Sequence, residues 1–244
     1  MRKTRNGDLR EPIPVVLRPR WAGLLCLGLL IGACDNTPDA VPVFQEPLHR
    51  LVHERPEARL LDVRIMPDDT SLFHIHAHDI FFAVVDGSKV WAESSTGGVG
   101  HVTWNAGYLG DNIRYSFGSK VHRVGNDGDR TFRLFAIENL GDPTCLDSLE
   151  MGRVGLLGDP AVEDVRFRAY QLVLEPGDSV TSHVHVYPLL ILQSTVGQVV
   201  VTSGGLDAPL ILSKGEWYWE ESGVIHRYIN ESDSSVTIVE IEVR

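Results

Sequence analysis

The sequence predicts an all-β chain with two similar barrels in tandem. Short runs rich in β-branched and aromatic residues alternate with Gly, Asp, Asn and Pro clusters along most of its length. A helical period appears only in a short stretch near residues 48–51. The order of motifs in the first half is repeated in the second half, and 244 residues are enough for two domains of about 100 residues each.

Nine runs are the strand candidates, and turn-forming residues separate them at the spacing typical of β-sandwiches and β-barrels. In the first half they are residues 60–65, 80–85, 120–124 and 131–137. In the second half they are residues 170–174, 189–192, 199–202, 227–229 and 235–243.

Each half carries the same series of residues in the same order. A proline is followed seven residues later by a His-x-His pair, then by a glycine, and then by a third histidine that precedes an asparagine by four residues. The series is Pro67, His74, His76, Gly87, His122 and Asn126 in the first half, and Pro176, His183, His185, Gly197, His226 and Asn230 in the second. Ordered matches of this kind indicate an internal duplication.

The histidines of each half are predicted to form a metal site. Alternate residues of a strand face the same side, so a His-x-His pair points two imidazoles into one barrel, where a third histidine can join them. Three such nitrogens with open positions suit Fe(II), Zn(II), Ni(II) or Cu(II), and each ring's other nitrogen should bond a carboxylate or carbonyl. The predicted ligands are His74, His76 and His122, and then His183, His185 and His226. The alternative is a barrel in which the duplicated histidines bind no metal.

The repeated unit resembles the double motif of the cupin superfamily. That motif reads Gly, five residues, His-x-His, three or four residues, Glu, six residues, Gly, and later Gly, five residues, Pro-x-Gly-x-x-His-x-x-x-Asn. In the second half the matching residues are Gly177, His183, His185 and Gly197, and then Gly215, Gly223, His226 and Asn230. The resemblance spans residues 56–140 and 165–244 and implies a bicupin, with two tandem double-stranded β-helix (jelly-roll) barrels.

The chain departs from the cupin motif at several positions. Other residues stand where the motif has glycine or proline: Asp68, Asp111, Phe117 and Ser119 in the first unit, and Glu221 in the second. Ile80 and Leu190 stand where the motif has its glutamate, so each unit is predicted to offer three neutral imidazoles and no carboxylate ligand. This ligand set resembles that of thiol dioxygenases, which implies an iron that binds an anionic substrate beside dioxygen.

Other polar residues near the motifs have open roles. His78 can be a fourth ligand or an acid–base group if the strand continues, whereas a bend would turn it away. Asp79 has the opposite parity and is expected to face outward. Tyrosines near the second unit could donate to a bound anion, although filling the barrel wall is their commoner role; they are Tyr187, Tyr218 and Tyr228.

The N-terminal segment resembles a bacterial lipoprotein signal. Basic residues up to Arg20 precede an apolar run at 21–33 that is too short to span a bilayer, and small residues lead into Cys34. The resemblance implies export, a diacylglyceryl anchor on Cys34 and, because Asp35 follows, retention at the periplasmic face of the inner membrane. The alternatives are a short membrane anchor and a cytosolic chain with a chance apolar run.

The predicted organisation is a signal peptide at 1–33, a tether at 34–44, a cupin domain at 45–140, a linker at 141–160 and a second cupin domain at 161–244. Cys145 lies in the linker and is the one cysteine of the mature chain besides the lipidated Cys34. Nearby Asp142 and Asp147 disfavour a thiolate, which argues against a nucleophilic role for Cys145.

The net charge argues against nucleic-acid binding. The formal charge of the chain is −11; residues 1–33 hold six basic and two acidic side chains, so the remaining 16 basic and 31 acidic side chains give −15. Such a surface repels nucleic acid and anionic lipid headgroups. The sequence also contains no phosphate-binding loop, dinucleotide fingerprint or serine nucleophile elbow.

The sequence therefore predicts a lipid-anchored metalloprotein that oxidises a small organic molecule in a dioxygenase-like reaction. Fe(II) is the favoured metal, with Zn, Mn, Ni or Cu as alternatives. A non-redox isomerase, lyase or hydrolase and a non-catalytic protein that binds a small molecule are the other hypotheses, because one fold can carry many chemistries. The sequence defines neither the substrate nor the oligomeric state.

Overall fold

The computed structural model describes residues 39–142 and 158–244, and both ranges consist almost entirely of β-strands and turns. The all-β prediction is confirmed, and the only helix of the described residues is a 3₁₀ turn, η1 (Val43–Gln45). The stretch near residues 48–51 belongs to strand β2 (His49–Glu54) rather than to a helix. It is extended because it pairs antiparallel with β3 (Ala58–Ile65), which satisfies its backbone groups.

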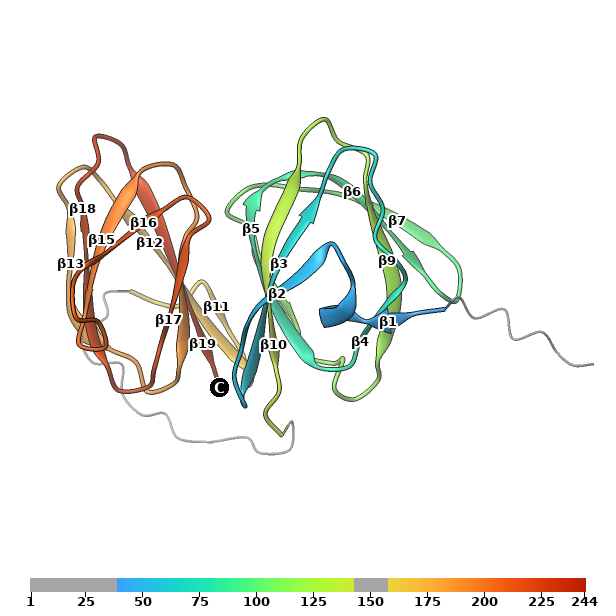
Figure 1. The fold of residues 1–244 in the computed structure, drawn as a ribbon, viewed down its shortest axis with the longest axis horizontal. Helices are drawn as coiled ribbons and strands as arrows, with labels where there is room; N and C mark the ends of the chain where they lie inside the picture. The colour runs from blue at the N-terminus through green and yellow to red at the C-terminus, as the bar shows by residue number, and fades with distance from the viewer. Residues whose placement is uncertain (1–38, 143–157) are drawn as a thin grey trace, which may run out of the picture. The chain divides into compact units, whose positions relative to one another are not determined.

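Two five-stranded sheets form the first barrel, drawn from blue to green in Figure 1, with the strand orders β1-β4-β9-β6-β7 and β2-β3-β10-β5-β8. The strands not yet given are β1 (Val41–Pro42), β4 (His74–His76), β5 (Asp79–Asp86), β6 (Ser88–Ser94), β7 (Val99–Trp104), β8 (Leu109–Asn112), β9 (Lys120–Asn126) and β10 (Phe132–Asn139).

The second barrel repeats this pairing. Its sheets have the orders β11-β12-β19-β14-β17 and β13-β18-β15-β16, so strands β12 to β19 pair in the same order as β3 to β10. Its strands are β11 (Val162–Glu163), β12 (Phe167–Leu174), β13 (Ser179–Val184), β14 (Leu189–Gln193), β15 (Gln198–Ser203), β16 (Leu210–Ser213), β17 (Trp217–Glu220), β18 (Ile225–Asn230) and β19 (Val236–Val243). Each of the nine predicted runs overlaps one of these strands, and the duplication seen in the sequence is a duplication of the fold.

The turn before each His-x-His pair has the same backbone conformation in both barrels. Asp68 and Gly177 both have positive φ, 67° and 81°, a left-handed conformation that glycine adopts freely and that aspartate tolerates better than most residues. The N–H groups of these two residues donate to the carbonyl oxygens of Asn126 and Asn230, at 2.9 and 3.0 Å. The asparagine that follows the third histidine therefore holds the turn that leads to the first two.

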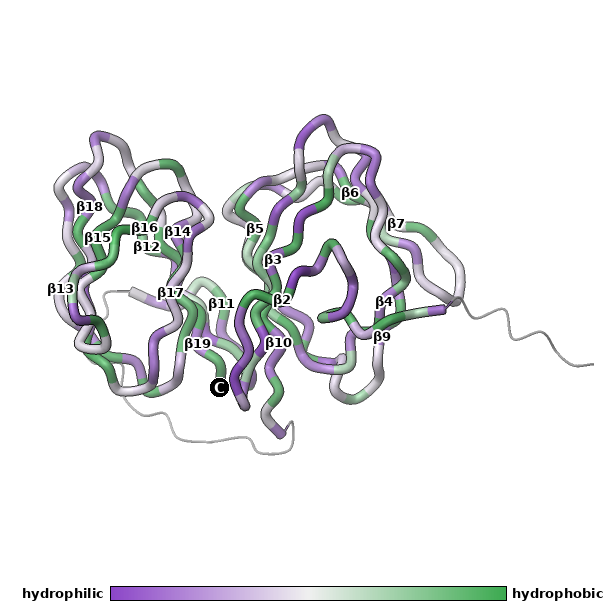
Figure 2. Tube along the Cα trace, viewed as in Figure 1, coloured by the Kyte–Doolittle hydropathy of each residue, from purple (hydrophilic) through white to green (hydrophobic). Residues whose placement is uncertain are grey.

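Three hydrophobic clusters form the core of the described residues. One fills the first barrel, one fills the second, and one lies between the sheets that contain β10 and β19. Figure 2 shows hydrophobic stretches along both of these strands. All eight residues of β19 are buried, because Val236 and Ile238 face the interior of the second barrel while Val239 and Ile241 belong to the middle cluster. By alternation, Glu240 points into the second barrel.

The first barrel begins earlier than predicted. β1 pairs in parallel with β4, and Val43 is buried in the core, so residues 41–44 of the predicted tether belong to the barrel. The predicted signal peptide, Cys34 and Cys145 lie outside the described residues. Within residues 39–142 and 158–244, no helix has the length and apolar character needed to cross a membrane.

Candidate metal centres

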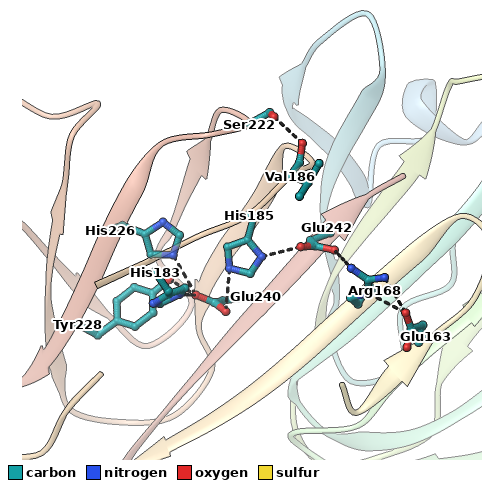
Figure 3. A network of polar contacts seen from close by, with 10 residues as sticks. All are labelled: Glu163, Arg168, His183, His185, Val186, Ser222, His226, Tyr228, Glu240 and Glu242. Atoms are coloured by element: carbon teal, nitrogen blue, oxygen red, sulfur yellow. Dashed lines mark hydrogen bonds and ion pairs between the residues drawn. The ribbon is translucent and has the colours of Figure 1, made fainter. Parts of the chain in front are cut away.

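The second barrel brings together three histidines and a glutamate (Figure 3). His183 in β13 lies opposite His226 in β18, His185 follows the end of β13, and Glu240 comes from β19. Their ligand atoms all lie within 4.8 Å of one another, and none of the four residues is more than 2% exposed. The structure thus gathers the predicted trio of this half and adds a carboxylate.

The spacing of these donor atoms fits a metal ion. Glu240 Oε1 lies 2.9 Å from His183 Nε2 and 3.1 Å from His226 Nε2. Glu240 Oε2 lies 3.3 Å from His185 Nε2. Metal–ligand bonds of about 2.1 Å place neighbouring donors roughly 3.0 Å apart in an octahedron and roughly 3.4 Å apart in a tetrahedron. The four side chains are therefore close enough to share a divalent ion.

The prediction that each unit lacks a carboxylate ligand is wrong for the second barrel. The cupin motif has its glutamate after His-x-His, but there this chain has Leu190, which packs in the cluster between the barrels. The carboxylate comes instead from the last strand, where Glu240 and Glu242 alternate with Val239 and Ile241. Two glutamates spaced by two in an otherwise apolar strand were the available signal, because buried carboxylates require partners.

Glu240 is the shared acceptor of this cluster. Burial alone would raise the pKa of its carboxyl, but hydrogen bonds from His183 and His226, together with the nearby charge of His185, hold that pKa well below its usual range. Tyr228 also donates its hydroxyl to Glu240, and burial together with this carboxylate raises the pKa of Tyr228 well above its usual value. The carboxyl group is therefore an ionised ligand candidate surrounded by donors.

A second glutamate fixes the orientation of His185. Glu242 accepts a hydrogen bond from His185 Nδ1 at 2.6 Å and lies 3.2 Å from Arg168, which in turn pairs with Glu163 (Figure 3). Burial alone would lower the pKa of His185, but Glu240 and Glu242 together raise it to about 9. The bond at Nδ1 leaves Nε2 directed at the centre, which is the arrangement expected of a metal-ligating histidine.

The first histidine of each pair is oriented in the same way in both barrels. Nδ1 of His74 lies 3.0 Å from the carbonyl oxygen of Leu72, and Nδ1 of His183 lies 2.9 Å from that of Thr181. A carbonyl oxygen can only accept, so Nδ1 carries the proton in each ring. In His74, Nε2 then keeps its lone pair for a metal, whereas Nε2 of His183 faces the Glu240 carboxylate and must release a proton to bind one.

The first barrel brings its predicted trio together as well. His74 in β4 lies opposite His122 in β9, and His76 Nε2 is 3.1 Å from His122 Nε2. The ligand atoms of the trio lie within 4.8 Å of one another. His74 Nε2 is buried and has no hydrogen-bond partner. Because an unpartnered buried nitrogen is costly, this atom fits a metal ion as its missing partner.

The first centre differs from the second in its charge. No carboxylate of the described residues joins this trio, and the strand register places Ala136 of β10 where β19 has Glu240. Burial, with nearby histidines, lowers the pKa of His74 to about 2 and that of His122 to about 4. The imidazoles are therefore neutral, which is the form that binds metals.

A cavity of about 220 Å³ adjoins the first centre. His76 and His122 line it together with the rings of Phe82, Trp104 and Phe132. Phe82 stacks on Trp104 at 4.8 Å between ring centroids, and Trp104 meets Phe132 edge to face at 5.7 Å. Ala136 also lines the cavity, so the space exists partly because a small residue replaces the glutamate of the second barrel.

His49 lines the same cavity and was not predicted as a site residue. It begins β2, its Nδ1 lies 2.6 Å from Glu46 Oε2, and its ring centroid lies 4.4 Å from that of His74. It is not one of the mutually close donors of the trio. The repeat contained no signal for it. β2 precedes the duplicated motif, and its counterpart in the second barrel, β11, has only two residues.

The other polar candidates lie outside both donor groups. His78 stands at a bend between β4 and β5 and joins neither group. Asp79, expected to face outward, is instead buried, with Arg166 of the second barrel 3.2 Å away. Tyr218 packs against the core of the second barrel, and Tyr187 lies against the C-terminal arginine.

Comparison with known proteins bears on the fold. No protein-family model matches the chain, and no curated protein matches its sequence. Solved structures do match. AerE from Microcystis aeruginosa is 12% identical with a TM-score of 0.58, over 82% of this chain and 98% of that protein.

Two further structures match over most of their length. A cupin 2 conserved barrel domain protein from Leptotrichia buccalis is 10% identical, with a TM-score of 0.51 over 80% of this chain and 88% of its own. A salicylate 1,2-dioxygenase from Pseudaminobacter salicylatoxidans is 14% identical, with a TM-score of 0.52 over 77% and 71%. At these identities the likeness concerns the fold alone. Together with the repeated strand order, it shows that this chain has the fold of two tandem cupin barrels.

Proposed function

We propose that the protein is a metal-dependent cupin whose first barrel oxidises a small organic molecule in a dioxygenase-like reaction. The observation that carries this proposal is the trio of neutral imidazoles, without a carboxylate, at the wall of a cavity of about 220 Å³. A catalytic metal site keeps coordination positions open for substrate, and a three-histidine set does so. A ferrous ion held by His74, His76 and His122 would supply redox chemistry toward dioxygen.

The side chains of the first barrel would position the metal and an organic molecule. The carbonyl of Leu72 fixes the ring of His74, so that its Nε2 points at the centre. An organic molecule in the cavity would contact His76, His122 and aromatic rings of the wall. A salicylate 1,2-dioxygenase has a similar fold, so dioxygen chemistry is compatible with this architecture.

The second barrel has the character of a structural centre in this proposal. Its three histidines and Glu240 are buried and supply four donors, as in closed structural metal sites. Without an ion the same groups form an ion-paired cluster, because His185 is held protonated between two glutamates. A metal there would stabilise the barrel rather than meet the substrate.

We expect the Fe(II)-loaded full chain to consume dioxygen when small aromatic compounds are added. In a His76→Ala/His122→Ala variant the rate of oxygen uptake should be at least 100-fold lower. The reason is that these two imidazoles both hold the ion and line the cavity. An oxygen electrode gives the measurement, with His101→Ala on the exposed strand β7 as the matched control.

Three outcomes separate the hypotheses. Turnover that proceeds without oxygen and with Zn(II) or Mn(II) would replace the oxidation by a non-redox isomerase, lyase or hydrolase reaction. Tight binding of a small molecule with no turnover under any metal would make the protein a non-catalytic binding protein. Oxygen uptake that is equal in both variants would contradict the proposed role of the first centre.

The location at the periplasmic face of the inner membrane is also part of the proposal. Its support is the lipobox-like ending of residues 30–34, with Asp35 after the cysteine. In a bacterial host we expect the parent chain in the inner-membrane fraction and a Cys34→Ser variant largely in other fractions, unacylated. Equal fractionation of the two, with no acyl mass on the parent chain, would contradict a lipid anchor.

A further inference from the structure

We infer that the second barrel sets the geometry of the first metal centre through a chain of side-chain contacts. Arg166 of the second barrel lies against Asp79, and Asp79 accepts hydrogen bonds from Ser116. Tyr115, the residue before Ser116, stacks on the ring of His76. The inference rests on the proposed function, since it assigns positioning residues to the same centre.

The ring of His76 is oriented by a stacking contact in place of a hydrogen bond. Its counterpart in the repeat, His185, donates from Nδ1 to Glu242 at 2.6 Å. Nδ1 of His76 is buried and has no hydrogen-bond partner among the described residues. The ring of Tyr115 instead lies 5.2 Å from that of His76, centroid to centroid, with an angle of 30° between the planes. Because a metal-ligating ring needs a fixed orientation, Tyr115 is the side chain that supplies it here.

Tyr115 lies on a connection that is longer in the first barrel than in the second. Seven residues, 113–119, connect β8 to β9, whereas four residues, 221–224, connect the corresponding strands β17 and β18. The shorter connection contains no aromatic residue. Tyr115 packs against the core of the first barrel and lines the cavity together with His76. One side chain therefore supports the ligand and forms part of the cavity wall.

Asp79 anchors this connection. Its Oδ1 accepts hydrogen bonds from the backbone N–H of Ser116 at 3.1 Å and from the Ser116 hydroxyl at 2.8 Å. Asp79 is 1% exposed, and a carboxylate buried so deeply requires partners. In the second barrel Pro188 stands at the same step of three residues after the second histidine, so this anchor belongs to the first barrel alone.

Arg166 provides the partner of the other oxygen of Asp79. Its Nε lies 3.2 Å from Asp79 Oδ2, and Arg166 is itself buried. The guanidinium is held in place, because Nη2 donates to the side chain of Asn139 at 2.7 Å and to the carbonyl oxygen of Gly141 at 2.8 Å. Arg166 directly precedes β12 of the second barrel. The position of Tyr115 therefore depends on a residue of the second barrel.

The first test follows the ring protons of His76 by NMR, in metal-free full chain with isotope-labelled histidine. The ring current of a stacked aromatic side chain moves such protons upfield, so we expect Tyr115→Leu to move the His76 signals downfield. Tyr115→Phe keeps the ring and should leave them unchanged. Ser116→Ala and Arg166→Met should move them in the same direction by a smaller amount, because each loosens the anchor of Tyr115.

Tyr108→Leu is the matched control for Tyr115→Leu. Tyr108 is 50% exposed, and its ring contacts those of Phe82 and Trp104. Its loss should therefore leave the His76 signals unchanged.

Arg166→Met removes the cation beside a buried carboxylate and can prevent folding. Asp79→Asn is the milder variant for the same step, since its amide oxygen still accepts from Ser116, and it should also give a small downfield shift. Unchanged His76 signals in Tyr115→Leu would overturn the inference. So would a shift there that neither Ser116→Ala nor Asp79→Asn reproduces.

The second test measures Zn(II) affinity by competition with a chromophoric chelator. We expect Tyr115→Leu to lower the affinity of one of the two sites about tenfold, as when a residue that orients a metal ligand is lost. Asp79→Asn should lower it less, and should add nothing in the Tyr115→Leu background, because the two residues act in one chain. Equal affinities in all variants would overturn the inference. If the first centre takes up no zinc at all, the proposed function fails, and the NMR shifts alone decide whether the contact chain holds.

Discussion

The Glu240→Gln variant is expected to unfold with a free energy about 3 kcal/mol below that of the parent chain when a chelator is present. Glu240 is fully buried and accepts from His183, His226 and Tyr228, while His185 lies 3.3 Å from its second oxygen. Removing this charge leaves His185 without one of its two anionic partners inside the barrel. Breaking a buried ion pair from one side costs more than the pair itself contributes.

Denaturant unfolding followed by circular dichroism measures this effect. Glu231→Gln, at an exposed position just after β18, is the control for the same change of side chain and should stay within about 0.5 kcal/mol of the parent. Tyr228→Phe removes only one hydrogen bond to the same carboxylate and should cost about 1 kcal/mol. A Glu240→Gln variant as stable as the parent would show that the carboxylate is not the hub of this cluster.

Replacing His74 and His122 by alanine is expected to remove one of two metal equivalents from the full chain. The two residues lie opposite each other in β4 and β9 and supply two of the three donors of the first centre. The His183→Ala/His226→Ala variant is expected to remove the other equivalent, because it deletes two donors of the second centre. Removing a residue that only hydrogen-bonds a metal ligand lowers metal affinity by about 10- to 100-fold. Removing two ligands at once is expected to lower it further, so that the ion is lost.

Inductively coupled plasma mass spectrometry on protein purified without a chelating tag counts the ions. His78→Ala/His101→Ala is the matched double control, since neither histidine belongs to a donor group, and it should keep both equivalents. Unchanged metal content in both test variants would place the ions elsewhere. The metal that copurifies also matters, because iron in the first centre favours oxidation, whereas zinc or manganese favours non-redox catalysis.

The duplicated histidines and the fold were predictable because both depend on periodicity along the chain. A His-x-His pair on a strand must share a face, and the second copy of the motif made a chance match implausible. Even the left-handed turn at Asp68 follows from its alignment with Gly177. The long buried strands were equally accessible, since they are rich in β-branched and aromatic residues. More exposed strands such as β7 and β16 were not among the predicted runs.

Glu240 and His49 were missed for a different reason. Their positions depend on which face of a strand meets which neighbour, and β19 is buried on both faces, so its alternation does not show which side is the barrel interior. His49 lies on a strand that the repeat does not contain. The cavity exists partly because Ala136 stands where the second barrel has Glu240. This correspondence is known only once the register of β10 and β19 is known.

Anomalous X-ray diffraction from crystals of the full chain soaked anaerobically in Fe(II) tests most directly whether these histidines are metal centres. Data collected on both sides of the iron absorption edge locate the ions independently of activity. We expect one peak within about 2.3 Å of the Nε2 atoms of His74, His76 and His122, beside the cavity. A second peak is expected among His183, His185, His226 and Glu240. Ordered histidines with no peak at either position would contradict metal binding and leave two barrels held together by buried imidazoles and, in the second, by Glu240.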